Sequence, residues 1–332
     1  MAYSLTDNPG LIKVLSFLKT HNTEYLSGQD LSDVLKISRV AVWKHIKKIK
    51  ELGYKVESIQ KQGYRLVSNT KLLLPWEIAE GLETSKFGKK IFYFDSIGST
   101  QDHAMKMAQE VNNDGAVIIA RRQTLGKGRN GRKWISPKGG IWISIILNPR
   151  FDISVITLFP IAASLALSYA MEKCFKIKPE LKWPNDVTLR GKKVSGVLVD
   201  ASLESNKIEN IVLGVGINFD IKVKDLEKEL RGTPNFYGVA SLTKFKKSIS
   251  PVKFVQVVLV ELENIIELLN SQNVKKITKE WTKRSSTIGK NVKMKTKEGM
   301  LTGKALRIDS DGALVIRDKK NFRILAGDIV HL

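Results

Sequence analysis

The sequence predicts a multidomain α+β protein, and three observations lead to this fold class. A chain of 332 residues is longer than one typical hydrophobic core requires. Apolar residues recur at helical spacing through the first fifty positions, whereas strand-like and helical runs alternate in the middle. From about Ser285 only short strands separated by turn residues follow. We therefore expect a winged helix-turn-helix domain (residues 1–67), a central α/β domain (68–284) and a small C-terminal β-barrel (285–332).

The first domain is expected to contain three helices. The first begins after Pro9 and Gly10, where Leu11, Ile12, Leu15 and Leu18 recur at helical spacing, and it ends near His21. The second follows Ser27, with Asp30 at the capping-box position. Ser38 can cap the third helix. Its buried side is predicted to consist of Val42, Ile46 and Ile49.

Two strands follow this third helix, which stops at Gly53, and they meet in a turn at Lys61-Gln62-Gly63. A third helix in the major groove with a hairpin beside it is the docking geometry of winged helices on DNA. The candidate DNA contacts are Ser38, Arg39, Lys44, Lys47, Lys48 and Lys61. The alternative is a winged helix used for protein contacts only. Polar residues 68–70 are predicted to form a linker.

The central and C-terminal domains are predicted from runs with strand or helix periodicity. Central strands are expected at Ile91–Phe94, Ala116–Ala120, Ile141–Leu147 and Ile211–Ile217, with helices at Thr100–Glu110 and Val155–Phe175. Terminal strands are expected at Val292–Lys295, Met300–Ile308, Ala313–Arg317, Phe322–Leu325 and Ile329–Leu332. Residues 153–171 carry no charge, but serines and a proline dilute the run, so a core helix is favoured over a membrane span.

Charge and cysteine content restrict the partners and the compartment. The formal net charge of +22 attracts polyanions, although lysine scattered over the whole chain accounts for part of it. The single cysteine, Cys174, lies in an apolar stretch and is predicted to be a small buried hydrophobe. It allows no intrachain disulfide, and residues 1–10 lack a secretory signal, so a cytoplasmic location is expected.

The most informative segment runs from Gln123 to Trp134 and packs three glycines and four cations into a short loop. Glycine permits close backbone approach to a ligand, and Lys and Arg supply charge-assisted hydrogen bonds to phosphate or carboxylate oxygens. Neither the P-loop spacing nor the dinucleotide fingerprint is met. The alternative is a flexible basic surface loop.

Two further motifs lie downstream. Leu181 to Asp186 is predicted to form a strand ending in a rigid Pro184 turn that presents Asn185 and Asp186. Lys193 opens a strand just after a turn, so its ammonium can project from the sheet end toward a ligand.

Together these segments resemble the biotin protein ligase family, whose loop reads Gly-Arg-Gly-Arg-x-Gly-Arg and whose later motifs read Lys-Trp-Pro-Asn-Asp and Lys-x-x-Gly. The resemblance extends to Ser99-Thr100, Gln123, residues 214–218 and the terminal barrel, and thus covers nearly the whole chain. The head is similar to that of bifunctional biotin repressors. The resemblance implies a catalytic domain like that of class II aminoacyl-tRNA synthetases and an SH3-like barrel.

The resemblance also implies site residues. For biotin they are Ser99, Thr100, Gln123, Gly126, Lys127, Gly128, Arg129, Trp134 and Lys193. For ATP and the adenylate they are Arg129, Gly131, Arg132, Lys182, Asn185 and Asn218. The implied catalytic set is Lys193, Arg129, Arg132 and Asp186, and no metal ligand is assigned.

The activity implied is formation of biotinyl-AMP from biotin and ATP with Mg²⁺, followed by transfer to a lysine of a biotin carboxyl carrier protein. Operator DNA and an adenylate-bound homodimer are the further partners implied. Two positions depart from the family pattern. Lys127 replaces the first loop arginine, so a two-pronged contact becomes a single one, and Gln101 replaces the asparagine after Ser99-Thr100.

Three other functions compete with this interpretation. A lipoate or octanoate ligase shares the fold and the acyl-adenylate chemistry, but the basic glycine-rich loop and Lys-Trp-Pro-Asn-Asp favour biotin. A ligand-sensing regulator with a decayed ligase domain conflicts with the intact Arg129, Arg132 and Lys193. A general basic RNA- or DNA-binding protein leaves the site motifs unexplained.

Overall fold

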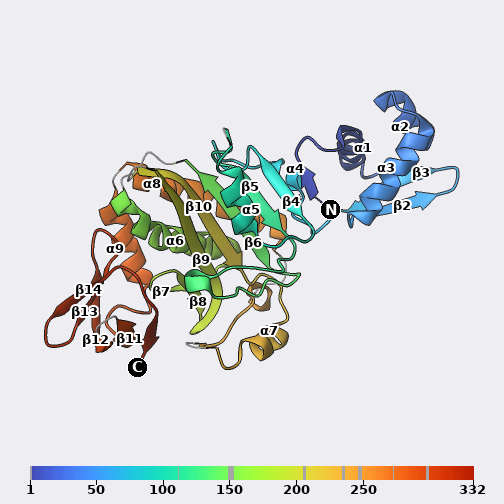
Figure 1. Cartoon of the computed structure of the whole chain (residues 1–332). Coiled ribbons are helices and arrows are strands. Elements are labelled where there is room, and N and C mark those ends of the chain that lie inside the picture. Colours follow the sequence, from blue (N-terminus) through green and yellow to red (C-terminus); the bar gives the residue numbers. More distant parts are fainter. Residues whose placement is uncertain are drawn as a thin grey trace.

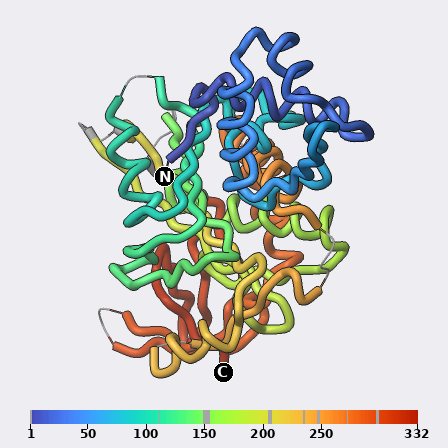
Figure 2. The backbone as a smooth tube through the Cα atoms, turned by 90° about the vertical axis from the view of Figure 1, so that its right-hand side faces the viewer, coloured from blue at the N-terminus to red at the C-terminus, as the bar shows by residue number. Residues whose placement is uncertain are grey.

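The three predicted parts are present in the computed structural model, which describes residues 2–110, 112–148, 153–204, 207–233, 236–245, 249–271, 273–296 and 299–332. The N-terminal head and the C-terminal domain lie at opposite ends of the central domain (Figures 1 and 2). The head consists of α1 (Pro9–Thr20), α2 (Gly28–Leu35), α3 (Arg39–Glu51), β2 (Lys55–Ile59) and β3 (Gly63–Ser68).

Local signals explain the helices and the hairpin of the head. Ser27 and Asp30 form the predicted capping box of α2, and the Ser38 hydroxyl accepts a hydrogen bond from the Ala41 amide at 3.2 Å at the start of α3. The turn between β2 and β3 contains left-handed backbone at Lys61 and at Gly63, where φ is 114°. The predicted winged helix-turn-helix is therefore confirmed as a fold.

An eight-stranded sheet forms the central domain, in the order β1-β4-β5-β6-β10-β9-β8-β7. Neighbouring strands are antiparallel except β4 and β5. The strands are β1 (Ala2–Ser4), β4 (Ile91–Phe94), β5 (Val117–Ala120), β6 (Ile141–Leu147), β7 (Glu180–Lys182), β8 (Asp186–Leu189), β9 (Lys192–Glu204) and β10 (Lys207–Ile217).

Helices cover both faces of this sheet (Figure 1). Side chains alternate along β5: Val117 and Ile119 join the main core, whereas Ile118 packs with Ala104 of α5 (Thr100–Met107). The main core also contains α6 (Phe159–Phe175) and α8 (Pro251–Asn270). The other described helices are α4 (Pro75–Ala79), α7 (Val223–Leu230) and α9 (Val274–Arg284), with 3-10 turns η1 (Arg129–Gly131), η2 (Ile153–Leu158) and η3 (Leu242–Lys244).

The stretch Val155–Phe175 is long and apolar enough to cross a membrane, but 67% of its most apolar window is buried inside the protein. It is the predicted core helix, and its first residues form η2 instead of continuing α6. Cys174, predicted to be buried, is only partly buried against the core.

The strand β1 was not predicted, and it lies in the central sheet although sequence analysis placed residues 2–4 in the head. It pairs with β4, and Tyr3 is only 7% exposed. The centroid of the Tyr3 ring lies 5.8 Å from the ring centroid of Trp76 and 6.4 Å from that of Tyr93. Three residues are too short a run to show a strand period, so the pairing depends on this tertiary contact.

A buried polar cluster joins the head to the central domain. The Glu77 carboxylate, 7% exposed, accepts hydrogen bonds from the Lys19 ammonium at 2.6 Å and from the Tyr54 hydroxyl at 2.7 Å. The Trp76 indole N–H donates to the Tyr54 oxygen at 2.8 Å. In the predicted linker, Thr70 is buried and donates to the Leu52 carbonyl at 2.7 Å. The head is thus held against Trp76 and Glu77 of the central domain, and the linker is bonded to the end of α3.

The C-terminal domain is all-β, as predicted. Its strands are β11 (Asn291–Thr296), β12 (Gly299–Ile308), β13 (Leu314–Arg317), β14 (Asn321–Ile324) and β15 (Ile329–His331), in the antiparallel order β14-β13-β12-β11-β15. The buried Trp183 indole donates to the Gly312 carbonyl at 3.1 Å, and its amide donates to the Thr287 hydroxyl at 3.1 Å. These bonds fix the C-terminal domain beside the Lys-Trp-Pro-Asn-Asp motif.

Candidate active site

A cavity of about 520 Å³ opens on the sheet face that α5 covers. Two glycines of β10 leave this face bare: an added Cβ would lie 2.4 Å from Gln101 Oε1 at Gly214 and 2.6 Å from Trp134 Nε1 at Gly216. The residues of the predicted site that line the cavity are Ser99, Thr100, Gln123, Lys127, Gly128, Arg129, Arg132, Trp134, Lys182, Asn185, Asp186, Lys193 and Asn218. Gly126 and Gly131 lie in the same loop but do not line it.

One end of the cavity is a buried network of neutral polar groups. The Thr100 amide and hydroxyl donate to the Gln123 side-chain oxygen at 2.7 and 3.0 Å. The Gln123 amide donates to the Ser136 hydroxyl at 2.9 Å, and the Ser144 hydroxyl lies 2.9 Å from that of Thr100. Ser99 caps α5 by accepting from the Asp102 amide. Donors and acceptors are thereby fixed in place for a neutral polar ligand group.

The departure at Gln101 has a structural explanation. The side chain is 4% exposed, and its amide donates to the Val212 carbonyl of β10 at 2.9 Å. Its oxygen lies 2.9 Å from the Ser144 hydroxyl. Gln101 therefore ties α5 to the sheet beneath the cavity.

The basic loop folds back on itself before it reaches Trp134. The Trp134 amide donates to the Gly126 carbonyl at 2.8 Å, and the Gly128 amide donates to the Arg132 carbonyl at 2.7 Å. A Cβ at Gly126 would lie 2.3 Å from the Trp134 oxygen, so no larger residue fits there. A glycine is favoured at position 131, because its φ of 71° lies in the left-handed region that other residues rarely adopt.

Two arginines of this loop connect the cavity to the rest of the chain. Arg129 donates to the Asn185 side-chain oxygen at 3.2 Å and to the Gly327 carbonyl at 3.4 Å. Arg132 pairs with Asp328 at 2.5 Å. Burial lowers the pKa of Arg129 from its ordinary value, against the attraction of nearby Asp328 and Asp186. The loop is therefore held by the segment that precedes the last strand.

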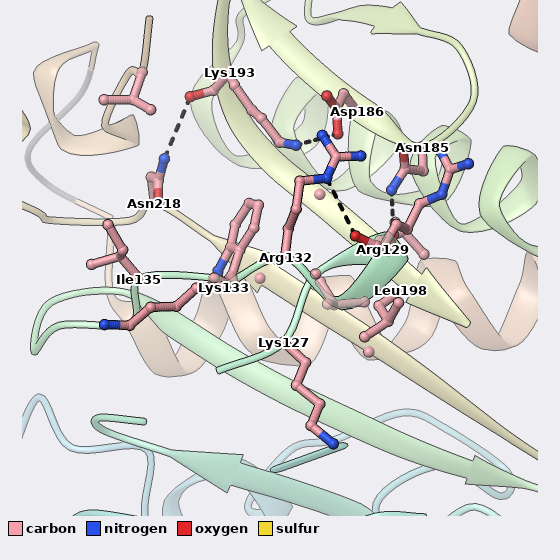
Figure 3. A pocket seen from close by; sticks show the side chains of 18 of the residues that line it. Lys127, Arg129, Arg132, Lys133, Ile135, Asn185, Asp186, Lys193, Leu198 and Asn218 are labelled. Atoms are coloured by element: carbon pink, nitrogen blue, oxygen red, sulfur yellow. Dashed lines mark hydrogen bonds and ion pairs between the residues drawn. The ribbon is translucent and has the colours of Figure 1, made fainter. Parts of the chain in front are cut away.

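Lys127 takes a different direction from the other loop cations. Its ammonium pairs with Asp102 of α5 at 2.5 Å. Figure 3 shows its side chain extending away from the group formed by Lys193, Asp186 and Arg132. Lys127 thus lines the cavity, but its charge is not brought together with that of Lys193 in this structure.

Lys193 and Asp186 form the charged centre of the cavity (Figure 3). The Lys193 ammonium lies 2.5 Å from Asp186 Oδ1 and 5.0 Å from the centroid of the Trp134 ring. Asp186 Oδ2 accepts a hydrogen bond from the Tyr237 hydroxyl at 2.6 Å. Within the described part of the chain, the buried Trp134 indole N–H has no hydrogen-bond acceptor. This nitrogen lies over Gly216, where an added Cβ would be only 2.6 Å from it.

Buried groups extend this centre. The Lys182 ammonium lies 3.6 Å from the centroid of the Tyr237 ring, and burial lowers the pKa of Lys182. Burial, with Asp186 nearby, raises the pKa of Tyr237. Asn218 is 2% exposed and donates to the Lys193 carbonyl at 3.4 Å, which gives it a structural contact at the end of β10.

Sequence reasoning missed several residues at this site: Asp102, Ser136, Ser144, Tyr237, Gly327 and Asp328. The two serines are single positions in a strand or a loop and belong to no local motif. Tyr237 and Asp328 lie far along the chain from Asp186 and Arg132, the groups that they contact. Only the Gly327-Asp328 turn before the last strand offered a signal.

Most of the predicted DNA contacts are exposed on the head. Ser38, Arg39, Lys44, Lys47 and Lys61 are exposed. Lys48 is the exception: it is half-buried, pairs with Glu51 at 3.2 Å and interacts with Tyr3 of β1. One residue further along α3 turns a side chain by about 100°, which directs Lys48 toward the central domain.

Among the described residues, no three His, Cys, Asp or Glu side chains lie together as a metal site. Three carboxylates line the cavity: Glu229, and Asp186 and Asp328, which are each paired with a cation. Mg²⁺ in nucleotide sites is held largely by substrate phosphates with one or two carboxylates. The donor set therefore fits a Mg²⁺ that arrives with ATP.

Comparison with known protein families matches each part of the chain. Residues 93–218 match the Biotin/lipoate A/B protein ligase family. Residues 11–65 match an HTH domain, and residues 287–332 match the biotin protein ligase C terminal domain. The three matches follow the order of the three structural parts.

Relatives with both a head and a ligase domain match over nearly their full length. The bifunctional ligase/repressor BirA of Bacillus spizizenii is 33% identical over 92% of this chain and 94% of its own. The protein of that name from Escherichia coli is 26% identical over 94% of both chains. The solved biotin protein ligase from Aquifex aeolicus, in complex with biotin and ATP, superimposes with a TM-score of 0.60 at 27% identity, over 73% of this chain and 98% of that one.

Proposed function

Because this chain belongs to the biotin protein ligase family, among relatives that are bifunctional ligase/repressors, we propose that it activates biotin with ATP and transfers it to a carrier-protein lysine. The acceptor is a biotin carboxyl carrier protein, as the name of a relative from Paracoccus denitrificans, biotin--[acetyl-CoA-carboxylase] ligase, suggests. The observation that carries the proposal is one cavity with a neutral polar end, an indole wall and a charged Lys193–Asp186 centre.

Biotin fits this cavity by its chemistry. Its neutral ureido ring needs donors and acceptors, which Ser99, Thr100 and Gln123 supply at the polar end. The apolar thiophane ring and valeryl chain pack against Trp134. The carboxylate then points to Lys193, whose ammonium lies beside the indole.

In the first half-reaction a biotin carboxylate oxygen attacks the α-phosphorus of ATP, and the bond to pyrophosphate breaks. Negative charge grows on the phosphoryl oxygens, so preplaced cations lower the barrier. Lys193, Arg129 and Arg132 supply them, while Lys182, Asn185, Gly131 and Asn218 form the nucleotide side. Mg²⁺ bound to ATP adds charge neutralisation. Lys127 reaches the biotin carboxylate only after leaving Asp102.

In the second half-reaction the ε-amine of the carrier lysine attacks the acyl carbon, AMP leaves, and an amide forms. Asp186 orients this amine, since its carboxylate faces the cavity. The loop from Gly126 through Gly128 to Trp134 closes over the adenylate, a mixed anhydride that water would otherwise hydrolyse.

The head binds operator DNA through the exposed residues Ser38, Arg39, Lys44, Lys47 and Lys61. The adenylate favours a homodimer, and two heads then bind two half-sites together. Since the ligand stabilises the dimer, it strengthens DNA binding, and carrier protein weakens it by consuming the adenylate. The need for ATP and carrier protein suggests that this activity takes place in the cytoplasm.

The test is biotin-dependent exchange of labelled pyrophosphate into ATP, which needs no carrier. Wild-type protein should exchange, and Lys193→Ala should lose the signal by at least about 100-fold. Lys192→Ala is the matched control, because Lys192 is exposed and lies 3.8 Å from Glu227. Exchange with octanoate instead of biotin indicates a lipoate-type ligase. No exchange from folded protein with Mg²⁺ indicates a ligand-sensing regulator.

Repression has its own test. Footprinting on the organism's biotin operon, with and without biotin and ATP, should show occupancy that follows the adenylate. Occupancy that is independent of both substrates would contradict the regulatory part and leave the ligase part standing.

A further inference from the structure

Tyr237 stands out among the cavity residues because its hydroxyl and its ring each contact a group of the charged centre. The hydroxyl donates to Asp186 Oδ2 at 2.6 Å, and the Lys182 ammonium lies 3.6 Å from the ring centroid. Tyr237 belongs to the segment after α7, outside the basic loop and outside the Lys-Trp-Pro-Asn-Asp motif. No sequence motif marks it.

We propose that Tyr237 is a positioning residue for adenylation: its hydroxyl holds the Asp186 carboxylate when Lys193 leaves that carboxylate for the substrate. This inference rests on the proposed function. The Asp186 side chain has one ion pair, with Lys193 at 2.5 Å, and one hydrogen bond, with Tyr237 at 2.6 Å.

Lys193 can act on a substrate only if Asp186 keeps a partner. The Asp186 side chain is 14% exposed, so a carboxylate abandoned there is poorly solvated. The Tyr237 hydroxyl continues to donate to it after the ammonium has moved. Without that hydroxyl, departure of the Lys193 ammonium would remove the last side chain in direct ion-pair or hydrogen-bond contact with Asp186 among the described residues. Only the more distant charges of Arg129 and Lys182 would then act on the carboxylate.

The backbone makes Tyr237 a fixed support. The Lys193 amide donates to the Gly238 carbonyl at 3.0 Å, and the Ala240 amide donates to the Lys193 carbonyl at 2.8 Å. The residue after Tyr237 is thereby paired with the main chain of Lys193. The Lys193 side chain can therefore swing from Asp186 to a ligand while the Tyr237 hydroxyl stays in place.

The test is Tyr237→Phe, which removes the hydroxyl and keeps the ring beside Lys182. In pyrophosphate exchange we expect kcat to fall about 10- to 100-fold, the rate equivalent of one hydrogen bond to a charged group. The KM for biotin should stay within about twofold, because the polar end of the cavity is untouched. Biotin affinity measured by calorimetry should match the wild type and reports a folded cavity.

The matched control is Tyr25→Phe, which removes a tyrosine–carboxylate hydrogen bond of 2.9 Å to Glu57 in the head. Its exchange rate should equal that of the wild type. A second readout distinguishes positioning from packing: in an Asp186→Asn background no carboxylate is stranded, so adding Tyr237→Phe should cost less than about twofold.

Each outcome decides the question. Wild-type kcat in Tyr237→Phe, or an equal loss with and without Asp186→Asn, overturns the inference and leaves the ligase function intact. A wild-type chain that shows no exchange overturns the proposed function, and this inference with it. A loss in kcat that disappears in the Asp186→Asn background supports the role of Tyr237.

Discussion

Replacing Tyr54 with Phe removes a buried hydroxyl that joins the head to the central domain through Glu77 and Trp76. Tyr54 is 3% exposed, donates to Glu77 at 2.7 Å and accepts from the Trp76 indole at 2.8 Å. A hydrogen bond to a charged group contributes about 1.5–3 kcal/mol, and an unpaired buried N–H costs about 1–3 kcal/mol. Lys19 still neutralises Glu77, so the lower ends apply. We expect the free energy of unfolding to fall by about 2.5 kcal/mol.

The assay is urea denaturation followed by circular dichroism, together with the rate of tryptic cleavage at the exposed Lys71. Tyr54→Phe should unfold at lower urea and be cut faster between the two domains. Tyr25→Phe, in which an exposed head carboxylate loses its tyrosine donor, should behave like the wild type. Pyrophosphate exchange should be unchanged in both variants. If both variants unfold and are cut like the wild type, the hydroxyl does not hold the junction and the reasoning is refuted.

Three further predictions concern the loop, the head and pH. Arg129→Gly removes the tethers to Asn185 and Gly327, so the adenylate should escape and label an unrelated protein on a streptavidin blot; label at the wild-type background would contradict this. Lys47→Ala should weaken operator binding and reduce the salt slope by about one, whereas Lys48→Ala should not. Burial lowers the pKa of three histidines, so below about pH 6.5 the folded chain binds fewer protons than the unfolded chain. The free energy of unfolding should therefore fall as the pH drops below about 6.5. Urea titrations at several pH values should show this decrease. These histidines are His45, His103 and His331.

Local signals explain which elements could be predicted. The capping box at Ser27 and Asp30, the cap at Ser38 and the turn at Gly63 lie within a few residues of the elements they define. Strand β4 has its predicted bounds because four consecutive apolar or aromatic residues are flanked by polar ones. Such signals need no knowledge of tertiary contacts.

Elements whose stability comes from distant partners could not be predicted. The strand β1 is three residues long and is held by β4 and by the rings of Trp76 and Tyr93. Lys48 and Lys47 are neighbours on the same basic helix, but only the docking of the head makes one half-buried. Sequence spacing describes a helix face and does not show what covers it.

The same limit applies to the active site. The basic loop and Lys193 could be identified because each lies within a recognisable motif, and the cavity contains them. Tyr237 and Asp328 come from segments 51 or more residues away from the groups that they contact. Their contribution depends on how the segment after α7 and the C-terminal domain fold back onto the loop.

Strand β4 provides a short route between the head and the biotin end of the cavity. On one side it pairs with β1, which precedes the head, and on the other it leads along the chain to Ser99 and Thr100. Tyr3 anchors β1 against Trp76, next to the buried cluster around Tyr54. A shift of β4 on ligand binding would therefore reach the head through backbone hydrogen bonds.

This route predicts that Tyr3→Ala separates the two functions. Pyrophosphate exchange should stay at the wild-type level, because Tyr3 lies outside the cavity. The increase in operator footprinting caused by biotin and ATP should become smaller, since β1 loses the ring that packs between Trp76 and Tyr93. Tyr3→Phe keeps that ring and is the matched control. An unchanged footprint response in Tyr3→Ala would show that the coupling between the active site and the head follows another path. The next segment to test would then be the linker, where Thr70 is bonded to Leu52.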